Sequence, residues 1–260
     1  MNQILSLSIY QLLFSYFFVL LVFLILRWRG IPREKELFLS SIRMTLQLIL
    51  TGYILLYLFD NPSPALTLVF LLCMELFAIY TIIKRAKTKL SKKLIQVIVV
   101  SMASGTLTCL LYFLYAVVWI SPWYDPRYVI PLAGMLIGNS MTGISLGVNQ
   151  LVGGMQTERD FVEGALMLGA TPKMAAKHIV DHAFDAAILP TINSMLGMGI
   201  VFLPGMMTGQ ILSGASPLLA IKYQIAIMFG ILGSVSLTVI LFLELGYRTF
   251  FQNQNQLQDL

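Results

Sequence analysis

Charged residues are scarce in this sequence. Only 11% of its 260 residues are Asp, Glu, Lys or Arg, whereas 58% are hydrophobic, and the mean hydropathy is +0.82. Several runs of about 20 residues are almost free of charge, which is the length that crosses a bilayer as a helix. A soluble globular domain does not need so much apolar surface. The composition therefore predicts an all-α, polytopic transmembrane helical bundle.

Other features are missing altogether. The chain has no G-x-x-x-x-G-K-[ST] sequence and no Gly-Lys pair, so it has no recognisable nucleotide-binding loop. Its two cysteines, Cys73 and Cys109, both fall in apolar runs, where we expect packed thiols and no disulfide. The N-terminus lacks the basic region and the cleavage site of a signal peptide, so we expect the first apolar run to be retained.

Seven apolar runs are predicted to be membrane spans. They cover about residues 7–26, 37–59, 65–83, 94–120, 128–151, 186–207 and 218–245. Basic residues cluster after the first, third, fifth and seventh runs, and the other links carry little positive charge. The positive-inside rule then predicts an N-terminus outside and a cytoplasmic C-terminus. The net charge of +5 is explained by these clusters, which indicate topology and not nucleic-acid binding.

A long polar loop, residues 153–185, interrupts the second half of the chain on the predicted cytoplasmic side. Apolar residues recur at helical spacing between Phe161 and Ala175. Thr171 is a candidate N-cap, and Pro172 would be the first residue of a second helix. Small residues would let another backbone approach closely: Gly164, Ala165, Gly169 and Ala170. A loop of this length with its own helices is typical of a functional element, and we predict a docking surface for a partner protein.

Among the polar residues within predicted spans, Glu75 and Asn139 are the strongest candidates for a role in function or packing. Glu75 is near the middle of the third span, where an ionisable group costs several kcal/mol unless it is paired or hydrated, so a functional role is the default hypothesis. The alternative is a protonated or hydrogen-bonded packing residue. Asn139 in the fifth span needs a buried partner or water, and the glycines spaced around it indicate tight helix packing.

Residues Gly143–Gly147 match G-x-S-x-G, with Ser145 at the centre. In a soluble hydrolase this would be a nucleophile elbow, but here it lies in a helical run with no strand before it. The two histidines, His178 and His182, are both in the polar loop. Packing is therefore favoured, and an intramembrane serine protease is kept as an alternative.

The two histidines are four residues apart, with Asp181 and Asp185 on the same helical face. Histidines at this spacing can share a metal ion, and the carboxylates would add oxygen ligands. A solvated face with complementary charges explains the same pattern and is favoured.

The end of the sixth span contains Pro204-Gly205, which breaks a membrane helix and frees backbone carbonyl groups. Broken helices often line substrate sites. Asn193 precedes the break, and Met206 and Met207 follow it with thioethers that suit soft metals, although methionine in a membrane helix usually only packs.

Several motifs resemble known permeases. Glu163-Gly164-Ala165-x-x-x-Gly169 resembles the E-A-A-x-x-x-G coupling motif of ABC importer permeases, with Gly164 in place of the second alanine and a Leu-Pro pair later than usual, at Leu189-Pro190. Nearly the whole chain is similar to the family of FetB-type permeases. The segments that carry this similarity are Ile130–Met141, Leu168–Ala170, Pro190–Met195, Leu203–Leu212 and Lys222–Ile225.

The resemblance implies the membrane subunit of an ABC-type transporter, a single permease domain over residues 1–260 in the inner (plasma) membrane. Bacterial members of the family are associated with iron export, and plant relatives with aluminium tolerance. A subunit of this kind is not itself an enzyme and binds no cofactor, because ATP is bound by a separate P-loop ATPase. ABC architecture also implies a homodimer of the permease.

Candidate functional residues follow from these expectations. The ATPase-coupling residues would be Glu163, Gly164, Ala165, Gly169, Ala170 and Pro172. The substrate path would be lined by Glu75, Asn139, Ser140, Asn193, Met206, Met207 and Gln210. Candidate metal ligands are Glu75, His178 and His182. An ATP-independent secondary transporter is the alternative, but the inverted repeat typical of that class is not visible in the sequence.

Overall fold

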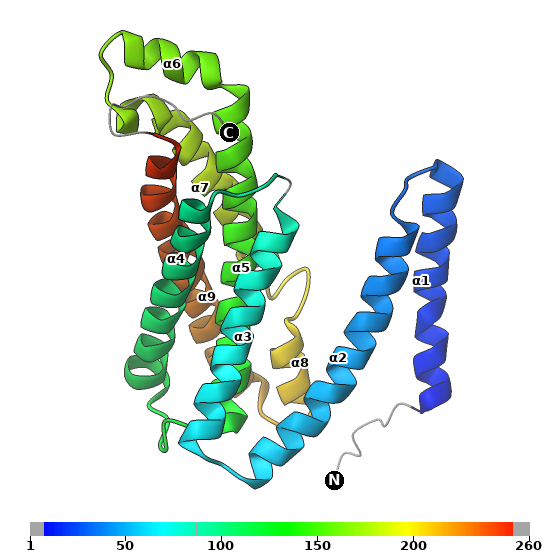
Figure 1. The fold of residues 1–260 in the computed structure, drawn as a ribbon. Coiled ribbons are helices and arrows are strands. Elements are labelled where there is room, and N and C mark those ends of the chain that lie inside the picture. The colour runs from blue at the N-terminus through cyan, green and yellow to red at the C-terminus, as the bar shows by residue number, and fades with distance from the viewer. Residues whose placement is uncertain (1–7, 87, 252–260) are drawn as a thin grey trace. The chain divides into compact units, whose positions relative to one another are not determined.

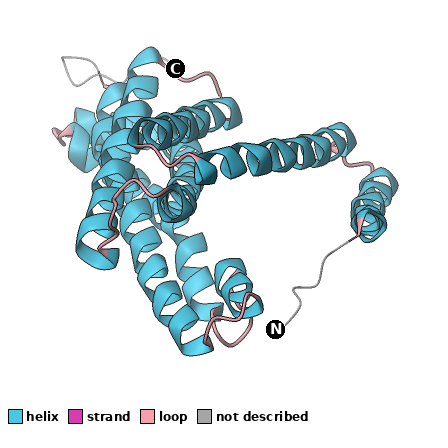
Figure 2. Ribbon diagram, turned by 90° about the horizontal axis from the view of Figure 1, so that it is seen from below, coloured by secondary structure: helices cyan, strands magenta, loops and turns pink. Residues whose placement is uncertain are grey.

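A computed structural model describes residues 8–86 and 88–251 of the chain, and every named element in that part is helical (Figure 2). An isolated backbone bridge joins Met198 and Phe202. The chain divides into two compact units, which are described separately. Of the described residues, the first unit contains those from Ser8 to Pro62 together with Leu212–Gly214, and the second contains the others. The predicted all-α fold class is confirmed.

The first unit is a helical hairpin of α1 (Ile9–Arg29) and α2 (Glu34–Asp60). Ser8 begins α1 with a capping box, in which its hydroxyl accepts from the Gln11 backbone N–H and the Gln11 side chain accepts in return. Gly30 ends α1 at φ 67°, a left-handed conformation that glycine adopts without strain. A hydrogen bond between the Tyr16 and Thr45 hydroxyl groups joins the two helices.

The second unit is a helical bundle with α5 at its centre, packed against four neighbouring helices, α3, α4, α7 and α9 (Figure 1). The elements of the bundle, in chain order, are α3 (Pro64–Arg85), α4 (Lys92–Tyr112), the π-helical turn η1 (Phe113–Val118), α5 (Pro126–Thr157), α6 (Arg159–Met167), α7 (Pro172–Gly197), α8 (Gly205–Leu212), α9 (Pro217–Gly246) and the 3₁₀ turn η2 (Tyr247–Phe250).

Small residues bring the helices of this bundle close together. A Cβ built on Gly105 of α4 would lie 2.4 Å from Thr238 Cγ2 of α9. The hydroxyl groups of Ser140 and Ser234 are hydrogen-bonded at 2.8 Å between α5 and α9, and both residues are fully buried. Of the span-five glycines, Gly143 packs tightly, because a Cβ built on it would lie 2.8 Å from Val235 Cγ1 of α9, whereas one built on Gly138 would meet no atom within 4 Å.

Six helices in the described part of the chain are long and apolar enough to cross a membrane, namely α1, α2, α3, α4 with η1, α5, and α9 with η2. They match six of the predicted spans, although residue 7 of the first lies outside the described residues. The predicted sixth span, residues 186–207, is wrong in its boundaries. Its first half is the end of α7, which stops at Gly197, and residues 198–204 are not helical.

The helix α7 stops early because glycine follows it. Gly199 has φ 83°, and the backbone turns there so that the Val201 N–H donates to the Gly197 carbonyl at 2.9 Å. The Pro204-Gly205 pair, which the sequence suggested as the break, instead lies at the start of the short helix α8, whose first residue is Gly205. Seven spans remain a prediction, with α7 as the additional one.

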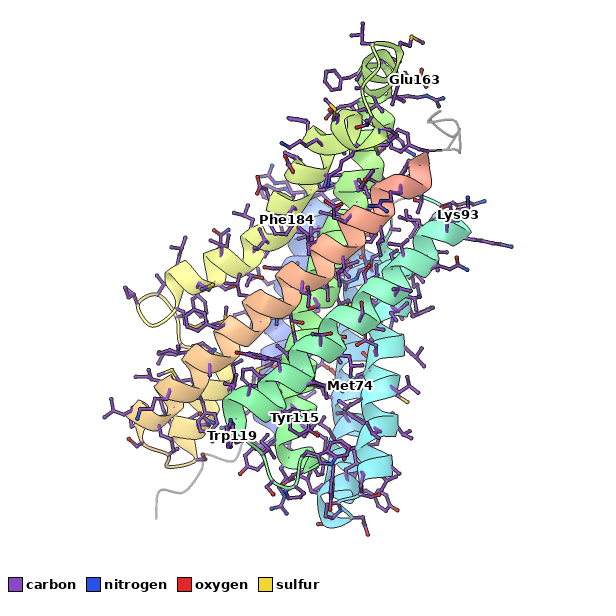
Figure 3. The ribbon with its side chains drawn as sticks, turned by 90° about the vertical axis from the view of Figure 1, so that its left-hand side faces the viewer. Met74, Lys93, Tyr115, Trp119, Glu163 and Phe184 are labelled. Atoms are coloured by element: carbon purple, nitrogen blue, oxygen red, sulfur yellow. The ribbon has the colours of Figure 1, made fainter. Side chains whose placement is uncertain are left out.

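The two ends of the bundle differ in character. Lys93 at the start of α4 lies at the same end as Glu163 of α6, whereas Tyr115 and Trp119 lie at the other end (Figure 3). A helix of 32 residues such as α5 is about 48 Å long, well beyond the hydrocarbon thickness of about 30 Å. The end of α5 that is followed by α6 can therefore lie outside the bilayer, at the same end of the bundle as Lys93 (Figure 3).

Candidate functional site

The polar loop forms a helix, a tight turn and a second helix, as predicted. It is shorter than expected, because α5 continues through Gly153 and Gly154 to Thr157, and the second loop helix is continuous with the predicted sixth span. The Thr171 hydroxyl accepts from the Met174 backbone N–H at 3.3 Å, and Pro172 is the first residue of α7. The predicted cap and helix start are confirmed.

The helix α6 is anchored by one apolar residue and held by local polar contacts. Val162 is fully buried against the bundle core. The Arg159 Nε donates to Glu163 Oε1 at 2.7 Å, one helical turn away. After α6, Gly169 adopts φ 90°, and the Ala170 N–H donates to the Ala165 carbonyl at 3.0 Å. The turn therefore depends on a glycine at position 169.

The tip of this segment is apolar and exposed. The most exposed side chains are Met167 at 86%, Leu168 at 91%, Met174 at 67% and Phe161 at 62%. A Cβ built on Gly164 or Gly169 would meet no atom within 4 Å, so both backbones are open to approach. Exposed apolar patches are typical of protein–protein or membrane interaction sites. We call these four exposed residues the α6–α7 tip.

A polar face runs along α5 at membrane depth. Asn139, Thr142 and Gln150 are exposed and Asn149 is half-buried, and their spacing places them on one side of the helix. Asn139 lies 13 residues, or about 20 Å, from the start of α5. Polar groups at this depth are unfavourable against lipid, so this face requires protein or water beside it.

Two polar groups of this face donate hydrogen bonds within their own helix. The Asn139 amide donates to the Met135 carbonyl at 2.7 Å, and the Thr142 hydroxyl donates to the Gly138 carbonyl at 3.1 Å. The oxygen atoms of both side chains retain acceptor capacity, and the Asn139 amide keeps a second hydrogen. A face of carbonyl and hydroxyl oxygens suits a hard cation.

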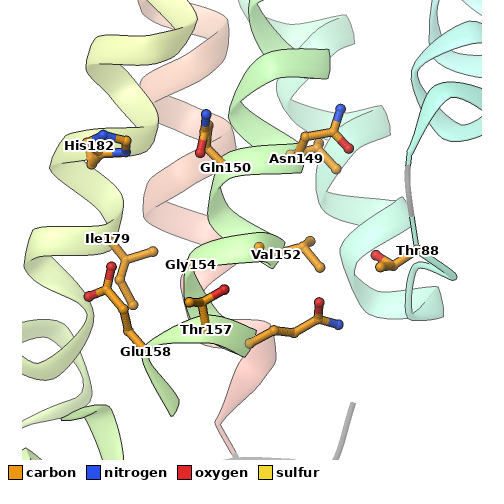
Figure 4. Close-up of a pocket in the computed structure, with 12 residues that line it drawn as sticks. Thr88, Asn149, Gln150, Val152, Gly154, Thr157, Glu158, Ile179 and His182 are labelled. Atoms are coloured by element: carbon orange, nitrogen blue, oxygen red, sulfur yellow. The ribbon is translucent and has the colours of Figure 1, made fainter. Parts of the chain in front are cut away.

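The polar face leads to a cavity of about 420 Å³ at the end of α5 next to α6 (Figure 4). Polar side chains from α5, α7 and the α3–α4 link line it: Thr88, Asn149, Gln150, Gln156, Thr157, Glu158 and His182. His178 Nδ1 lies 3.5 Å from Glu158 Oε2. The described residues include no group of three or more His, Cys, Asp and Glu side chains arranged for a metal ion. A metal ion held by His178 and His182 stays a prediction.

The other predicted path residues lie in different surroundings. Ser140 is buried and bonded to Ser234, so it packs between helices and does not share the polar face with its neighbour Asn139. Asn193 is exposed on α7. Three further residues belong to α8, where Met207 is buried and Met206 and Gln210 are half-buried. The sequence did not indicate Gln224 of α9, whose side-chain amide lies 3.8 Å from Met198 Sδ.

Glu75 also stands apart from the polar face. It lines a groove between α3, α4 and α5, where Thr106 Oγ1 is 3.2 Å from its Oε1 atom. The groove meets α5 at Ala133, Leu136 and Ile137. Ile137 and Asn139 are two positions apart, so their side chains leave α5 about 200° apart. Leu136 and Ala133 leave the helix about 60° and 120° from Asn139, so the groove and Asn139 lie on different sides of α5.

Ser145 shows no catalytic arrangement. Its hydroxyl donates to the Met141 carbonyl at 2.7 Å, one turn back in the same helix. Neither histidine is among its hydrogen-bond partners in the described part of the chain. This bond is typical of a serine that is accommodated within a membrane helix.

Comparison with known proteins places this arrangement in a family. Residues 9–251 match the model of the uncharacterised protein family UPF0014. The chain belongs to UPF0014. Among UPF0014 relatives, "Probable iron export permease protein FetB" of Escherichia coli is 34% identical over 239 residues, which cover 92% of this chain and 90% of that protein. The resemblance to FetB-type permeases is therefore confirmed, and the chain is a multi-pass membrane protein.

Other relatives of this chain come from a cyanobacterium and a plant. "UPF0014 membrane protein slr1647" of Synechocystis is 36% identical over 233 residues, 90% of each chain. "Protein ALUMINUM SENSITIVE 3" of Arabidopsis thaliana is 34% identical over 240 residues, 92% of this chain and 86% of that protein. No solved structure matches this member of UPF0014.

Proposed function

We propose that this protein is the membrane subunit of an ABC-type exporter of iron or a related metal ion in the plasma membrane. Two copies form a homodimer, and each binds one separate P-loop ATPase, which holds and hydrolyses the ATP. This chain binds no cofactor in the proposal and catalyses no reaction.

The α6–α7 tip is the observation that carries the proposal. It presents large exposed apolar side chains near the end of α5, a helix longer than the bilayer is thick, and in the proposal this end lies outside the lipid. Lys173 Nζ at the start of α7 lies 3.7 Å from Glu244 Oε2 near the end of α9, so a partner on the tip would touch segments connected to two long helices. In the proposal, Glu163, Gly164, Ala165, Gly169, Ala170 and Pro172 form the coupling segment that receives the ATPase.

The polar face of α5 supports a cation as the substrate. Its acceptor oxygens, at Asn139 and Thr142, suit a hard metal ion better than an anion. A bacterial relative carries iron export in its name. We propose that the path follows this face to the cavity next to α6, with Asn193 of α7 as a further polar group. A second copy of the chain would cover the face and complete the path.

Capture of the ATPase tests the proposal. The tagged chain is purified in a mild detergent from its native host, and the proteins that copurify are identified and quantified. We expect an ATPase with a P-loop in equimolar amount. Leu168→Asp should abolish its capture, because it places a charge in the centre of the apolar tip. Lys177→Asp, at another exposed position of α7, should retain it.

The outcome separates the two transport mechanisms. Absence of any P-loop ATPase in several mild detergents would reject the ABC-type proposal and favour an ATP-independent secondary transporter. Equal capture by the Leu168→Asp variant would reject the tip as the docking surface while leaving the ABC-type assembly intact.

A second experiment tests the path. Export of iron from loaded cells should fall strongly in Asn139→Leu, which replaces the acceptor oxygen with an apolar group of similar size. Ser145→Ala should export normally, because the Ser145 hydroxyl bonds only within its own helix among the described contacts. Loss of activity in Ser145→Ala together with normal export by Asn139→Leu would contradict the proposed path.

A further inference from the structure

The groove that contains Glu75 is a separate feature of the bundle. It has a volume of about 250 Å³ between α3, α4 and α5. Its floor is made of buried side chains that include Ala133 and Leu136, and its rim is made of Leu68, Leu72 and Leu107, each more than half exposed. The groove therefore opens on the outer surface of these three helices, where lipid chains lie.

Only two polar side chains line the groove, Glu75 and Thr106, and the remaining lining residues are apolar. Glu75 is the twelfth of the 22 residues of α3, so it lies about 16 Å from either end of the helix. The lining residues include no basic side chain. A carboxyl group at this depth is thus without an opposite charge in its own groove.

The Thr106 hydroxyl cannot occupy all the hydrogen-bond acceptor positions of the Glu75 carboxyl group. The Thr106 hydroxyl has one hydrogen, and two acceptors are within reach: the Met102 carbonyl at 2.7 Å and Glu75 Oε1 at 3.2 Å. The shorter contact lies within its own helix. The Glu75 carboxyl group, which lines the apolar groove, therefore has acceptor positions without a full hydrogen bond. A ligand with hydrogen-bond donors would occupy these positions.

We propose that the groove binds a lipophilic amine, with the ammonium group on the Glu75 carboxylate and the alkyl chain along the leucine side chains of α3 and α4. An ammonium group supplies both the missing positive charge and three donors, and a charge-assisted hydrogen bond is strengthened where water is excluded. The volume of the groove is smaller than that of most pockets for drug-sized ligands. The groove would therefore hold the ammonium group and the first part of the alkyl chain, and the rest of the alkyl chain would lie in the bilayer.

A metal ion fits this groove less well. Hard divalent cations take about six oxygen ligands, and the lining offers one carboxylate and one hydroxyl. The groove also lies on a different side of α5 from Asn139 of the proposed metal path. The amine site consequently does not depend on the ABC-type function, and it needs no ATPase for its test.

Photocrosslinking tests the site. The full-length protein, in phosphatidylcholine nanodiscs, is incubated with a twelve-carbon alkylamine that carries a diazirine in its chain. After irradiation, the labelled peptides are identified by mass spectrometry. We expect labelling within Leu68–Leu72 and at Leu107, and competition by dodecylamine but not by dodecanol, which has the same chain without the charge.

Variants assign the binding to the groove. Glu75→Gln keeps the side-chain shape but removes the charge, and it should weaken labelling by about 10- to 100-fold, the usual value of a hydrogen bond to a charged group. Ala103→Trp, at an exposed lining position of α4, should fill the groove and abolish labelling while Glu75 is retained. Glu244→Gln, a carboxylate outside the groove, should label normally.

The proposal would be overturned by equal labelling of Glu75→Gln, or by equal competition from dodecanol, because either shows simple partition into lipid. Displacement of the probe by Mn²⁺ but not by dodecylamine would also overturn it and would assign the Glu75 carboxylate to a metal ion.

Discussion

The contact between α5 and α7 beside the α6–α7 tip allows a sharp test with one methyl group. A Cβ built on Gly154 would lie 2.5 Å from Ile179 Cγ2, much closer than atoms pack. Ile179 is 3% exposed and β-branched, so in a helix it has essentially one side-chain conformation. The Gly154→Ala variant must therefore separate the two helices or force Ile179 into a strained rotamer.

The expected loss follows from this geometry. Overpacking a core costs about 1–3 kcal/mol. Alanine has a higher helix propensity than glycine, which stabilises the variant by about 0.5–1 kcal/mol. The net destabilisation should be about 1–2 kcal/mol, which lowers the melting temperature of a domain of this size by about 2–8 °C.

Gly153 provides the matched control, because it neighbours Gly154 in the same helix and a Cβ built on it meets no atom within 4 Å. Thermal unfolding is followed by the loss of the monodisperse peak in size-exclusion chromatography after heating in detergent. Gly154→Ala should melt lower than the unmodified protein, and Gly153→Ala at the same temperature or slightly higher. Equal melting of the two variants would refute the close approach of α5 and α7.

A double variant identifies the cause. Ile179→Ala alone should cost about 2–5 kcal/mol, as large core truncations do. In the Gly154→Ala background it should cost less, because it removes the atom that the new methyl group meets. A coupling free energy of about 0.5–3 kcal/mol is expected between contacting residues. Additive effects would show that the destabilisation by Gly154→Ala has another origin.

Three further predictions concern stability and use the same melting assay. Ser140→Ala should destabilise the bundle by about 1–3 kcal/mol, because it leaves the buried Ser234 hydroxyl without its partner in α5, whereas removal of both hydroxyl groups should be closer to neutral. Thr171→Ala should cost about 0.5–2 kcal/mol through loss of the α7 cap, and Thr171→Asp should restore it. Gly169→Ala should cost about 1 kcal/mol or more, because φ of 90° strains any residue with a Cβ, and Gly164→Ala in open space should be tolerated.

The fold was predictable where one physical rule dominated. Long apolar runs gave the six spans close to their observed bounds, because backbone groups in lipid have no alternative to a helix. The start of α7 was predictable because Thr171-Pro172 is a local signal. The end of α7 was misplaced, since Pro204-Gly205 looked like the stronger break, while the actual turn uses Gly199 in a left-handed conformation.

The candidate site was less predictable, because it depends on which way a helix faces. Asn139 and Ser140 are adjacent and both polar, but one is exposed and the other is buried against Ser234. Sequence spacing cannot tell these faces apart when both carry small and polar residues. The sequence singled out Glu75 by its depth in the third span, whereas its position relative to Asn139 required the packing of three helices.

The continuity of α7 has a mechanical consequence. The helix begins at Pro172 in the exposed tip and runs for 26 residues to Gly197, a length of about 39 Å, with the capped turn at one end and the Gly199 turn at the other. A push on its exposed end would tilt it about its crossing with α5, where a Cβ built on Gly147 would lie 3.8 Å from Ala187 Cβ. Pro190 lies inside the helix between this crossing and Asn193, so the movement that reaches Asn193 would depend on how α7 bends at Pro190.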